Sequence, residues 1–194
     1  MKTNIYYIEN TVPSEVCDEF NTIILNKVKP EEAQVGTSEE MKTIKDRRNS
    51  TVRWVKPEHQ ELWFKSFDLL KNFLIPINRM VFDIDISGGI FDIQHTEYQV
   101  DEHYNSWHSD TAFNPDSNAS QRKLSISIQL SDPNDYEGGD LEFADGHLVG
   151  IPREKLRGKG TVIIFPSFVT HRVTPVTKGV RHSLVSWCEG SAWR

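Results

Sequence analysis

The sequence predicts a mainly β chain with helices at its amino-terminal end, an α+β arrangement whose strands form a jelly roll. Apolar residues recur at helical spacing in the first 80 positions. Short β-branched and aromatic runs between turn residues follow, as is typical of a sandwich or barrel. The length of 194 residues fits one domain over 1–194, with helical support and a loop in 1–80 and the jelly-roll core in 81–190.

Two amphipathic helices are expected, over 13–27 and roughly 57–75. The first follows Thr11 and Pro13, a pair that is typical of a capped helix start. The second should end before Pro76, because proline lacks the N–H of a helical hydrogen bond and its ring clashes with the preceding turn.

Residues 29–50 lie between the helices and are polar and charged, with no clear period. We therefore expect a long exposed loop, which in a compact domain is usually functional or mobile. Its basic residues are either solvated or part of a substrate lid. Strands are expected over 90–99, 124–130, 140–143, 161–165, 171–176 and 180–187.

The last two strands are predicted to form a hairpin. Residues 177–179 end in glycine, which is typical of a three-residue hairpin loop, so Val176 would pair with Val180. Because side chains alternate along a strand, five residues would then share one face of the sheet. These are His171, Val173, Pro175, Arg181 and Ser183.

Charge and composition exclude several classes of protein. The net charge of −6 disfavours a partner such as duplex nucleic acid, and no apolar run reaches membrane-spanning length. The first residues lack a secretory signal, and Cys17 and Cys188 have no CxxC spacing, so we expect reduced thiols and a cytoplasmic location. No dimerisation signature is present, which leaves a monomer or a weak homodimer.

A histidine and a carboxylate two residues apart on a strand point the same way and can grip one metal ion. Three such pairs occur: His59 with Glu61, His95 with Glu97, and His108 with Asp110. The first lies in a predicted helix, where such positions diverge, and the second has no evident third ligand. The pair at 108 and 110 is therefore the candidate metal site.

His171, at the start of a later predicted strand, is the candidate third ligand. Two histidines and one carboxylate form the facial triad of non-haem Fe(II) oxygenases, and the same set also suits zinc with an open position. Arg181 would lie about 13 Å along the sheet, at ~3.3 Å per residue, and offers a fork of donors matched to a carboxylate. Ser183 on the same face could add a hydroxyl.

Further motifs lie around these residues in a fixed order. They are Tyr98 ten residues before His108, then HSD, KLSISIQLSDPNDYEGGDLEF, GKGTVIIFPSFVTHRVTPV, and Arg181-His182-Ser183 followed by Trp187. Over roughly 90–188 the sequence thereby resembles the Fe(II)/2-oxoglutarate-dependent dioxygenases, specifically the prolyl 4-hydroxylase-like branch that includes the bacterial PKHD-type hydroxylases.

The resemblance implies a double-stranded β-helix in which His108, Asp110 and His171 bind iron. It also implies that Arg181 pairs with the far carboxylate of 2-oxoglutarate, with Ser183 beside it.

Three more residues receive roles from the resemblance. Tyr98 matches a position that contacts the cosubstrate, and Tyr104 is a further neighbour. Gln129 stands where several prolyl hydroxylases have a second cosubstrate-binding tyrosine, and its amide could still donate to a carboxylate.

The implied activity is hydroxylation of a C–H bond by O2 with Fe(II), coupled to decarboxylation of 2-oxoglutarate to succinate and CO2, with ascorbate as an optional cofactor. Peptidyl proline in a peptide or protein is the leading substrate. A free amino acid, a lysyl side chain or a modified base is the alternative for the same chemistry. A non-catalytic jelly-roll binding protein and a zinc hydrolase are the alternatives from other classes.

Overall fold

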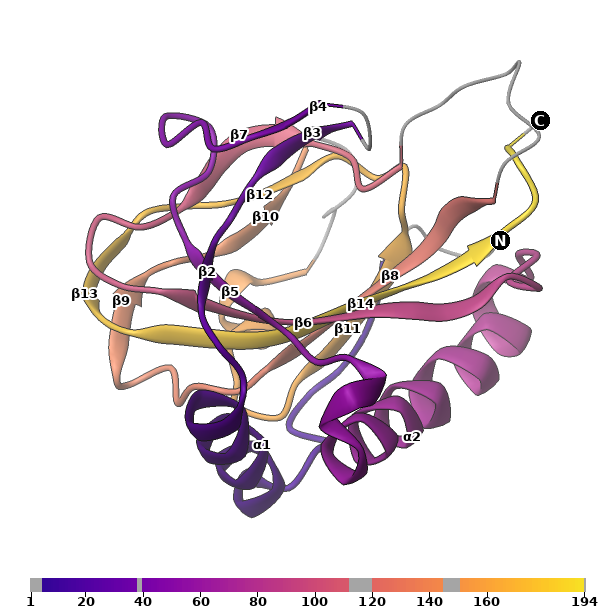
Figure 1. Cartoon of the computed structure of the whole chain (residues 1–194), viewed down its shortest axis with the longest axis horizontal. Coiled ribbons are helices and arrows are strands. Elements are labelled where there is room, and N and C mark those ends of the chain that lie inside the picture. Colours follow the sequence, from indigo (N-terminus) through magenta and orange to yellow (C-terminus); the bar gives the residue numbers. More distant parts are fainter. Residues whose placement is uncertain (1–4, 38–39, 112–119, 145–150, 194) are drawn as a thin grey trace.

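The computed structural model describes residues 5–37, 40–111, 120–144 and 151–193. Two β-sheets face each other, and the two long helices cover the outer side of the larger sheet (Figure 1). The chain is mainly β with helices near its amino-terminal end, as the sequence predicts.

The larger sheet has seven strands and holds most of the long ones. In spatial order they are β1 (Tyr6–Ile8), β11 (Val162–Pro166), β8 (Gln121–Gln129), β14 (Arg181–Gly190), β6 (Gly89–Tyr98), β5 (Thr51–Trp54) and β2 (Glu31–Glu32). The smaller sheet consists of β10 (Leu141–Phe143), β12 (His171–Val173) and β7 (Tyr104–His108). Two ribbons pair β13 (Val176–Gly179) with β9 (Tyr136–Gly138), and β3 (Val35–Thr37) with β4 (Glu40–Lys42).

The side chains of β8 point alternately to the two faces of the larger sheet, and their polarity differs between the faces. Ile126 and Ile128 point outward and pack in one buried cluster with Ile24 and Leu70 of the helices. Ser125 and Ser127, one position away, point to the opposite face, toward the smaller sheet. The largest apolar cluster thus lies under the helices, while β8 presents polar side chains to the space between the sheets, where a smaller apolar cluster with Phe143 and Phe165 also lies.

The first helix, α1 (Ser14–Lys27), agrees with the predicted range. Pro13 occupies the position before its first turn, and no side chain caps the helix there. The start is therefore set by the fixed φ of proline rather than by a hydrogen bond from Thr11.

The second helix, α2 (Glu61–Ile77), differs from the prediction at both ends. A 3₁₀ turn over Pro57–His59 precedes it, and Pro76 lies inside its last turn instead of beyond it. The backbone then widens into a π-helical turn over Asn78–Phe82, where the Asp83 N–H donates to the Asn78 carbonyl at 2.7 Å. Proline has no N–H to donate, so one hydrogen bond of the last helical turn is missing. The wider π-helical turn continues the chain beyond this point. A further 3₁₀ turn covers Arg153–Leu156.

The prediction of one exposed loop over 29–50 is wrong. The segment contains β2, β3 and β4, and the side chains of Ala33 and Val35 are buried. Its backbone finds partners outside the segment, because β2 pairs with β5, which follows it in sequence. Such pairing orders a segment that has no apolar periodicity, which is why periodicity did not predict these strands.

The predicted hairpin between 171–176 and 180–187 is also wrong. Val176 pairs with Gly138, so β12 belongs to the smaller sheet and β14 to the larger one. The chain crosses between the sheets through Pro175 and through Gly179, which has φ +72°. His171 and Arg181 therefore do not share a sheet face.

The other predicted strands are present with shifts of up to three residues at their ends, while β1, β5, β7 and β9 were not predicted. Both cysteines, Cys17 and Cys188, are buried and free, and burial raises their pKa to about 11 and about 12. None of the helices in the described part of the chain has the length and apolar character needed to cross a membrane.

Candidate active site

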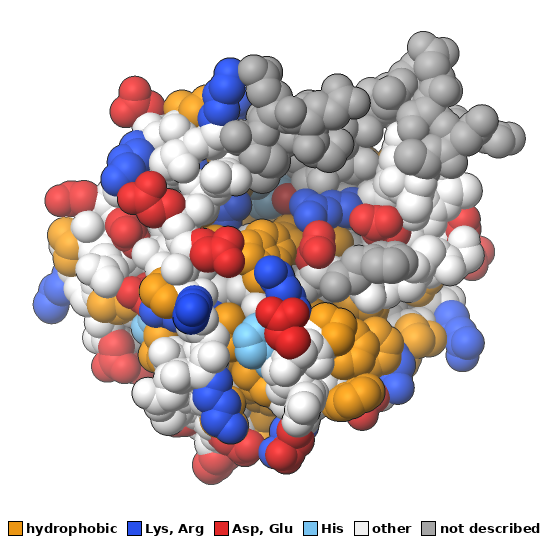
Figure 2. All heavy atoms as spheres, in the orientation of Figure 1, with side chains coloured by type: hydrophobic (Ala, Val, Ile, Leu, Met, Phe, Trp, Pro, Cys, Tyr) orange, Lys and Arg blue, Asp and Glu red, His pale blue; other side chains and the backbone are white. Residues whose placement is uncertain are grey.

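A cavity of about 520 Å³ lies between the two sheets. Its wall includes residues of β5, β6, β7, β8, β12 and β14, together with residues of the segment before β5. Figure 2 shows the hollow from outside, with acidic and basic side chains around it. Two groups of residues lie along this wall, a His–Asp–His cluster and an arginine-centred cluster, and a pair of serines beside the cavity contacts the first of them.

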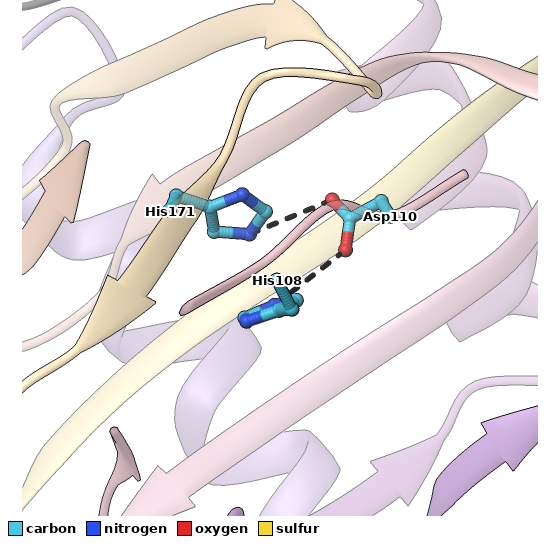
Figure 3. A group of neighbouring side chains, drawn as sticks. All are labelled: His108, Asp110 and His171. Atoms are coloured by element: carbon cyan, nitrogen blue, oxygen red, sulfur yellow. Dashed lines mark ion pairs between the residues drawn. The ribbon is translucent and has the colours of Figure 1, made fainter. Parts of the chain in front are cut away.

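His108, Asp110 and His171 come together at one end of the cavity, and each offers a ligand atom within 4.8 Å of the others. The Nε2 atoms of His108 and His171 lie 3.9 and 3.7 Å from the two oxygens of Asp110 (Figure 3). The histidines are cross-strand neighbours, since His108 ends β7 and His171 begins β12. Asp110 is placed by its backbone, whose N–H donates to the Ser167 carbonyl at 2.8 Å.

Backbone carbonyls fix the tautomer of both histidines. Nδ1 of His108 lies 2.9 Å from the Ser106 carbonyl, and Nδ1 of His171 lies 2.9 Å from the Val169 carbonyl. A carbonyl can only accept, so Nδ1 carries the proton in each ring and Nε2 keeps its lone pair toward Asp110. This is the arrangement that a metal-binding histidine needs.

The charge state of the cluster also suits a divalent cation. Burial, assisted by the nearby His171, lowers the pKa of His108 to about 4. Burial alone would raise the pKa of Asp110, but His171, His108 and a hydrogen bond from Ser125 together hold it below its usual value. Near neutral pH, His108 is therefore uncharged and Asp110 is ionised.

Two serines that the sequence reasoning missed hold the carboxylate of Asp110. Ser125 Oγ lies 2.6 Å from Asp110 Oδ2 and 3.0 Å from Ser167 Oγ. Since a carboxylate only accepts, Ser125 donates to Asp110 and Ser167 donates to Ser125. The signal in the sequence was the alternation of Ser125, Ser127 and Gln129 with apolar residues, which marks a polar face on an otherwise buried strand.

The second cluster lies on the larger sheet. Arg181 is the cross-strand neighbour of Tyr98, and Ser183 is that of Gln129. The Arg181 guanidinium lies 5.5 Å from the centre of the Tyr98 ring, and its Nη2 donates to Gln129 Oε1 at 2.8 Å. The sheet register thus brings together four residues that are far apart in the sequence.

These four residues do not all reach the cavity. Tyr98, Arg181 and Ser183 line it, whereas Gln129 is buried behind Arg181 and donates to Ser127. Among the described residues, Arg181 Nη1 is buried without a hydrogen-bond partner. A buried guanidinium N–H beside a cavity fits a carboxylate ligand, because a desolvated donor needs an acceptor.

Three further residues from the sequence analysis have definite places. The Tyr104 ring stacks on His108, with centroids 3.6 Å apart and planes at 10°. His95 and Glu97 point to the opposite face of the larger sheet, where His95 Nε2 donates to Asn21 Oδ1 at 2.7 Å and Glu97 accepts from Arg53 at 2.7 Å. That pair is therefore remote from the cavity.

The comparison with protein families matches residues 93–189, half of the chain, to the 2OG-Fe(II) oxygenase superfamily. A PKHD-type hydroxylase of Synechococcus sp. (strain CC9902) is 41% identical over 83 residues, which are 43% of this chain and 35% of the relative. One from Pseudoalteromonas atlantica is 33% identical over 115 residues, 58% of this chain and 49% of the relative. The chain thus matches less than half of the length of these relatives.

Solved structures share the fold over almost the whole chain. A viral collagen prolyl hydroxylase from Paramecium Bursaria Chlorella virus-1, in complex with 2OG, aligns with a TM-score of 0.69 at 20% identity and covers 97% of both chains. A prolyl hydroxylase from Trichoplax adhaerens, in complex with a hypoxia inducible factor peptide fragment, aligns with a TM-score of 0.70 at 18% identity and covers 96% of this chain and 83% of that one.

Proposed function

This chain belongs to the 2OG-Fe(II) oxygenase superfamily, and on that premise we propose that it is a dioxygenase that hydroxylates a C–H bond of a peptide. The observation that carries the proposal is the convergence of two clusters on one cavity. His108, Asp110 and His171 offer a divalent-metal ligand set, and Arg181 offers an unpaired buried donor.

In this proposal His108, Asp110 and His171 hold Fe(II). When bound, the iron supplies the oxidation chemistry, with O2 and 2-oxoglutarate as co-reactants and succinate and CO2 as products. The chain itself presents two Nε2 lone pairs whose tautomers are fixed by backbone carbonyls, and an ionised carboxylate held by Ser125. Zinc suits the same three ligands, but a zinc hydrolase would leave Arg181 without a function.

Arg181 is proposed to bind the far carboxylate of 2-oxoglutarate, with Tyr98 and Ser183 as neighbours in the cavity wall. Gln129 does not line the cavity, and its hydrogen bond to Nη2 of Arg181 supports a role in orienting the guanidinium instead. Tyr104 packs against His108 and limits how its ring can turn.

The finer architecture that we propose is a double-stranded β-helix over 81–190, with 1–80 as support, in a single domain over 1–194. The chain alternates between the two sheets, and this supports the proposal. The larger sheet contains β6, β8, β11 and β14, and the smaller one contains β7, β10 and β12. Winding between two facing sheets is how a jelly roll is built.

Peptidyl proline is the substrate that we propose. The support lies in the structural neighbours, several of which are prolyl hydroxylases and one of which holds a peptide. Fold likeness is a weak guide to the target, so a free amino acid, a lysyl side chain and a modified base are the other candidates.

The test is anaerobic titration of the purified protein with Fe(II) and then 2-oxoglutarate, followed by O2 and a succinate assay. The wild type should develop the weak visible band of a chelated 2-oxo acid and then form succinate. His108→Ala and Asp110→Ala should lose both, since each removes a ligand. Arg181→Ala should raise the concentration of 2-oxoglutarate needed by at least about tenfold, because a charge-assisted bond contributes about 1.5–3 kcal/mol.

The outcomes separate the candidate functions. Undiminished turnover in all three variants would contradict the site assignment. Tight zinc binding without any band after iron loading would favour the hydrolase or the non-catalytic binding protein.

A further inference from the structure

Arg48 is a basic side chain of the cavity wall without an acidic partner. It lies in the segment just before β5 and lines the same cavity as the His–Asp–His cluster. Of the other arginines there, Arg122 donates to Asp92 at 2.9 Å and Arg181 donates to Gln129. No carboxylate in the described part of the chain lies within ion-pair distance of Arg48, and its side chain donates from Nε to Ser50 Oγ at 3.2 Å.

The Arg48 guanidinium is held in place without using its two terminal amino groups. It lies 4.9 Å from the centre of the Tyr104 ring, which in turn stacks on His108 at 3.6 Å. A column of three stacked groups therefore runs from Arg48 to a candidate metal ligand. Among the described residues, no acceptor takes the Nη1 and Nη2 donors, so they can bind a ligand in the cavity.

The backbone around Arg48 is fastened to the strand that carries His108. Asn49 and His103 exchange two backbone hydrogen bonds of 2.8 and 2.7 Å, and the Ser106 N–H donates to the Arg47 carbonyl at 3.3 Å. Because these bonds flank Arg48 on both sides, the position of its side chain is set before any ligand arrives. Such preorganisation lowers the entropic cost of binding.

We propose that Arg48 binds a carboxylate group of the substrate next to the carbon that is hydroxylated. The inference rests on the proposed function and deepens it by naming a chemical feature of the substrate. A planar guanidinium fork matches a carboxylate with two parallel hydrogen bonds. Arg181, on β14 of the larger sheet, is the residue assigned to the cosubstrate, so the two anions have separate partners.

Acidic residues at the same cavity favour a ligand with a single carboxylate over a polyanionic ligand. Glu31 and Glu32 of β2 are exposed and line the cavity, and within the described part of the chain only Glu32 forms an ion pair, with Lys45 at 3.4 Å. Charges of both signs surround the hollow in Figure 2. A nucleotide or another polyphosphate would be repelled by this acidic pair, whereas a molecule with one carboxylate and a neutral or cationic remainder would not.

The carboxylate has two sources, a free amino acid or an acidic residue beside the target in a peptide. The test uses protein loaded anaerobically with Fe(II) and 2-oxoglutarate, and calorimetric titration with matched probes. The free probes are L-proline and L-lysine, each against its carboxamide. The peptide probes are acetylated peptides in which proline or lysine is followed by Glu or by Gln.

In the wild type we expect a carboxylate probe to bind about tenfold or more tightly than its uncharged partner, as one charge-assisted contact implies. Arg48→Gln should reduce that preference to within about twofold, and Arg48→Lys, which keeps the charge without the fork, should fall between. Arg47→Gln is the matched control, because Arg47 is an exposed neighbour that does not line the cavity. It should keep the full preference.

A preference within the free pairs identifies a free amino acid, and one within the peptide pairs identifies an acidic peptide; either supports the proposal. Wild-type protein that does not distinguish any pair, or a preference that survives in Arg48→Gln, overturns it. Succinate formation under O2 is measured on the same samples. A chain that keeps the carboxylate preference but forms no succinate contradicts the proposed function and leaves the role of Arg48 standing.

Discussion

Contacts on several sides hold the carboxylate of Asp110 in a position that suits a metal ligand. Its backbone is fixed by Ser167, its Oδ2 accepts from Ser125, and the two histidines face its two oxygens. A carboxylate held in this way loses little rotamer freedom on binding a cation. Ser125 is thus a positioning residue that acts through Asp110.

Replacing Ser125 should weaken metal binding more than it weakens the fold. We expect Ser125→Ala to lower metal affinity about 10–100-fold, the usual effect of losing a hydrogen bond to a ligand. Anaerobic Fe(II) titration, with Co(II) as a spectroscopic substitute, measures it. Ser66→Ala is the control, since Ser66 is equally buried but bonds to the Leu62 carbonyl in α2. Equal metal affinity in both variants would contradict this role.

At the scale of elements, the connection from β12 to β14 decides which residues can meet. The chain leaves the smaller sheet at Val173, pairs with β9 as β13, and enters the larger sheet at Arg181. Gly179 makes this possible, because its φ of +72° lies in the left-handed region, which glycine enters with the least strain. A Cβ there would also lie 2.0 Å from the Asp135 carbonyl oxygen.

Gly179→Ala should therefore destabilise the protein by at least about 1–3 kcal/mol, the cost of a residue held in a sparsely populated backbone region. Urea unfolding monitored by tryptophan fluorescence measures the change. Lys178→Ala is the matched control in the same strand, because its ion pair with Glu137 is exposed and contributes below about 1 kcal/mol. If both variants unfold at the same urea concentration, the strain argument fails.

At the scale of the whole molecule, a buried polar cluster joins the helices to the larger sheet. His95 is fully buried, donates to Asn21 of α1, and lies with its ring 5.2 Å from that of His182. Arg53 and Glu97 pair beside it. Burial, with smaller contributions from His182 and Arg53, lowers the pKa of His95 to about 3.

This cluster should make the fold sensitive to acid. The unfolded chain binds a proton at His95 near pH 6.5, whereas the folded chain does so only near pH 3, so the unfolded state binds more protons in between. Stability should fall by up to about 1.4 kcal/mol for each pH unit below 6.5. Glu97 adds to this loss at the acidic end, because a hydrogen bond from His182, together with Gln99 and Arg53, lowers its pKa despite its burial.

The measurement is urea unfolding at a series of pH values from 7 to 4. His95→Gln should make the dependence of stability on pH less steep, since one of the two buried histidines with a lowered pKa, His95 and His108, is removed. His59→Gln, at a site outside the buried cluster, should leave the slope unchanged. A slope that is the same in wild type and His95→Gln would show that other groups govern acid unfolding.

The sequence by itself determined the mainly β class, the first helix and the strands β6, β8, β10, β11, β12 and β14, because each depends on local periodicity and turn residues. It also determined which residue types and spacings were candidates for the site. His108 and Asp110 stand two apart beside a strand end, and Arg181 and Ser183 stand two apart on β14.

Only the tertiary structure decided which of these residues face each other. The hairpin expected around Gly179 is a crossing between sheets, and the loop expected before β5 contains strands that bring Arg48 into the cavity. Ser125 and Ser167 became neighbours only through the pairing of β8 with β11. Strand partners are chosen by packing and hydrogen bonds between segments far apart in the chain, and local patterns carry little information about that choice.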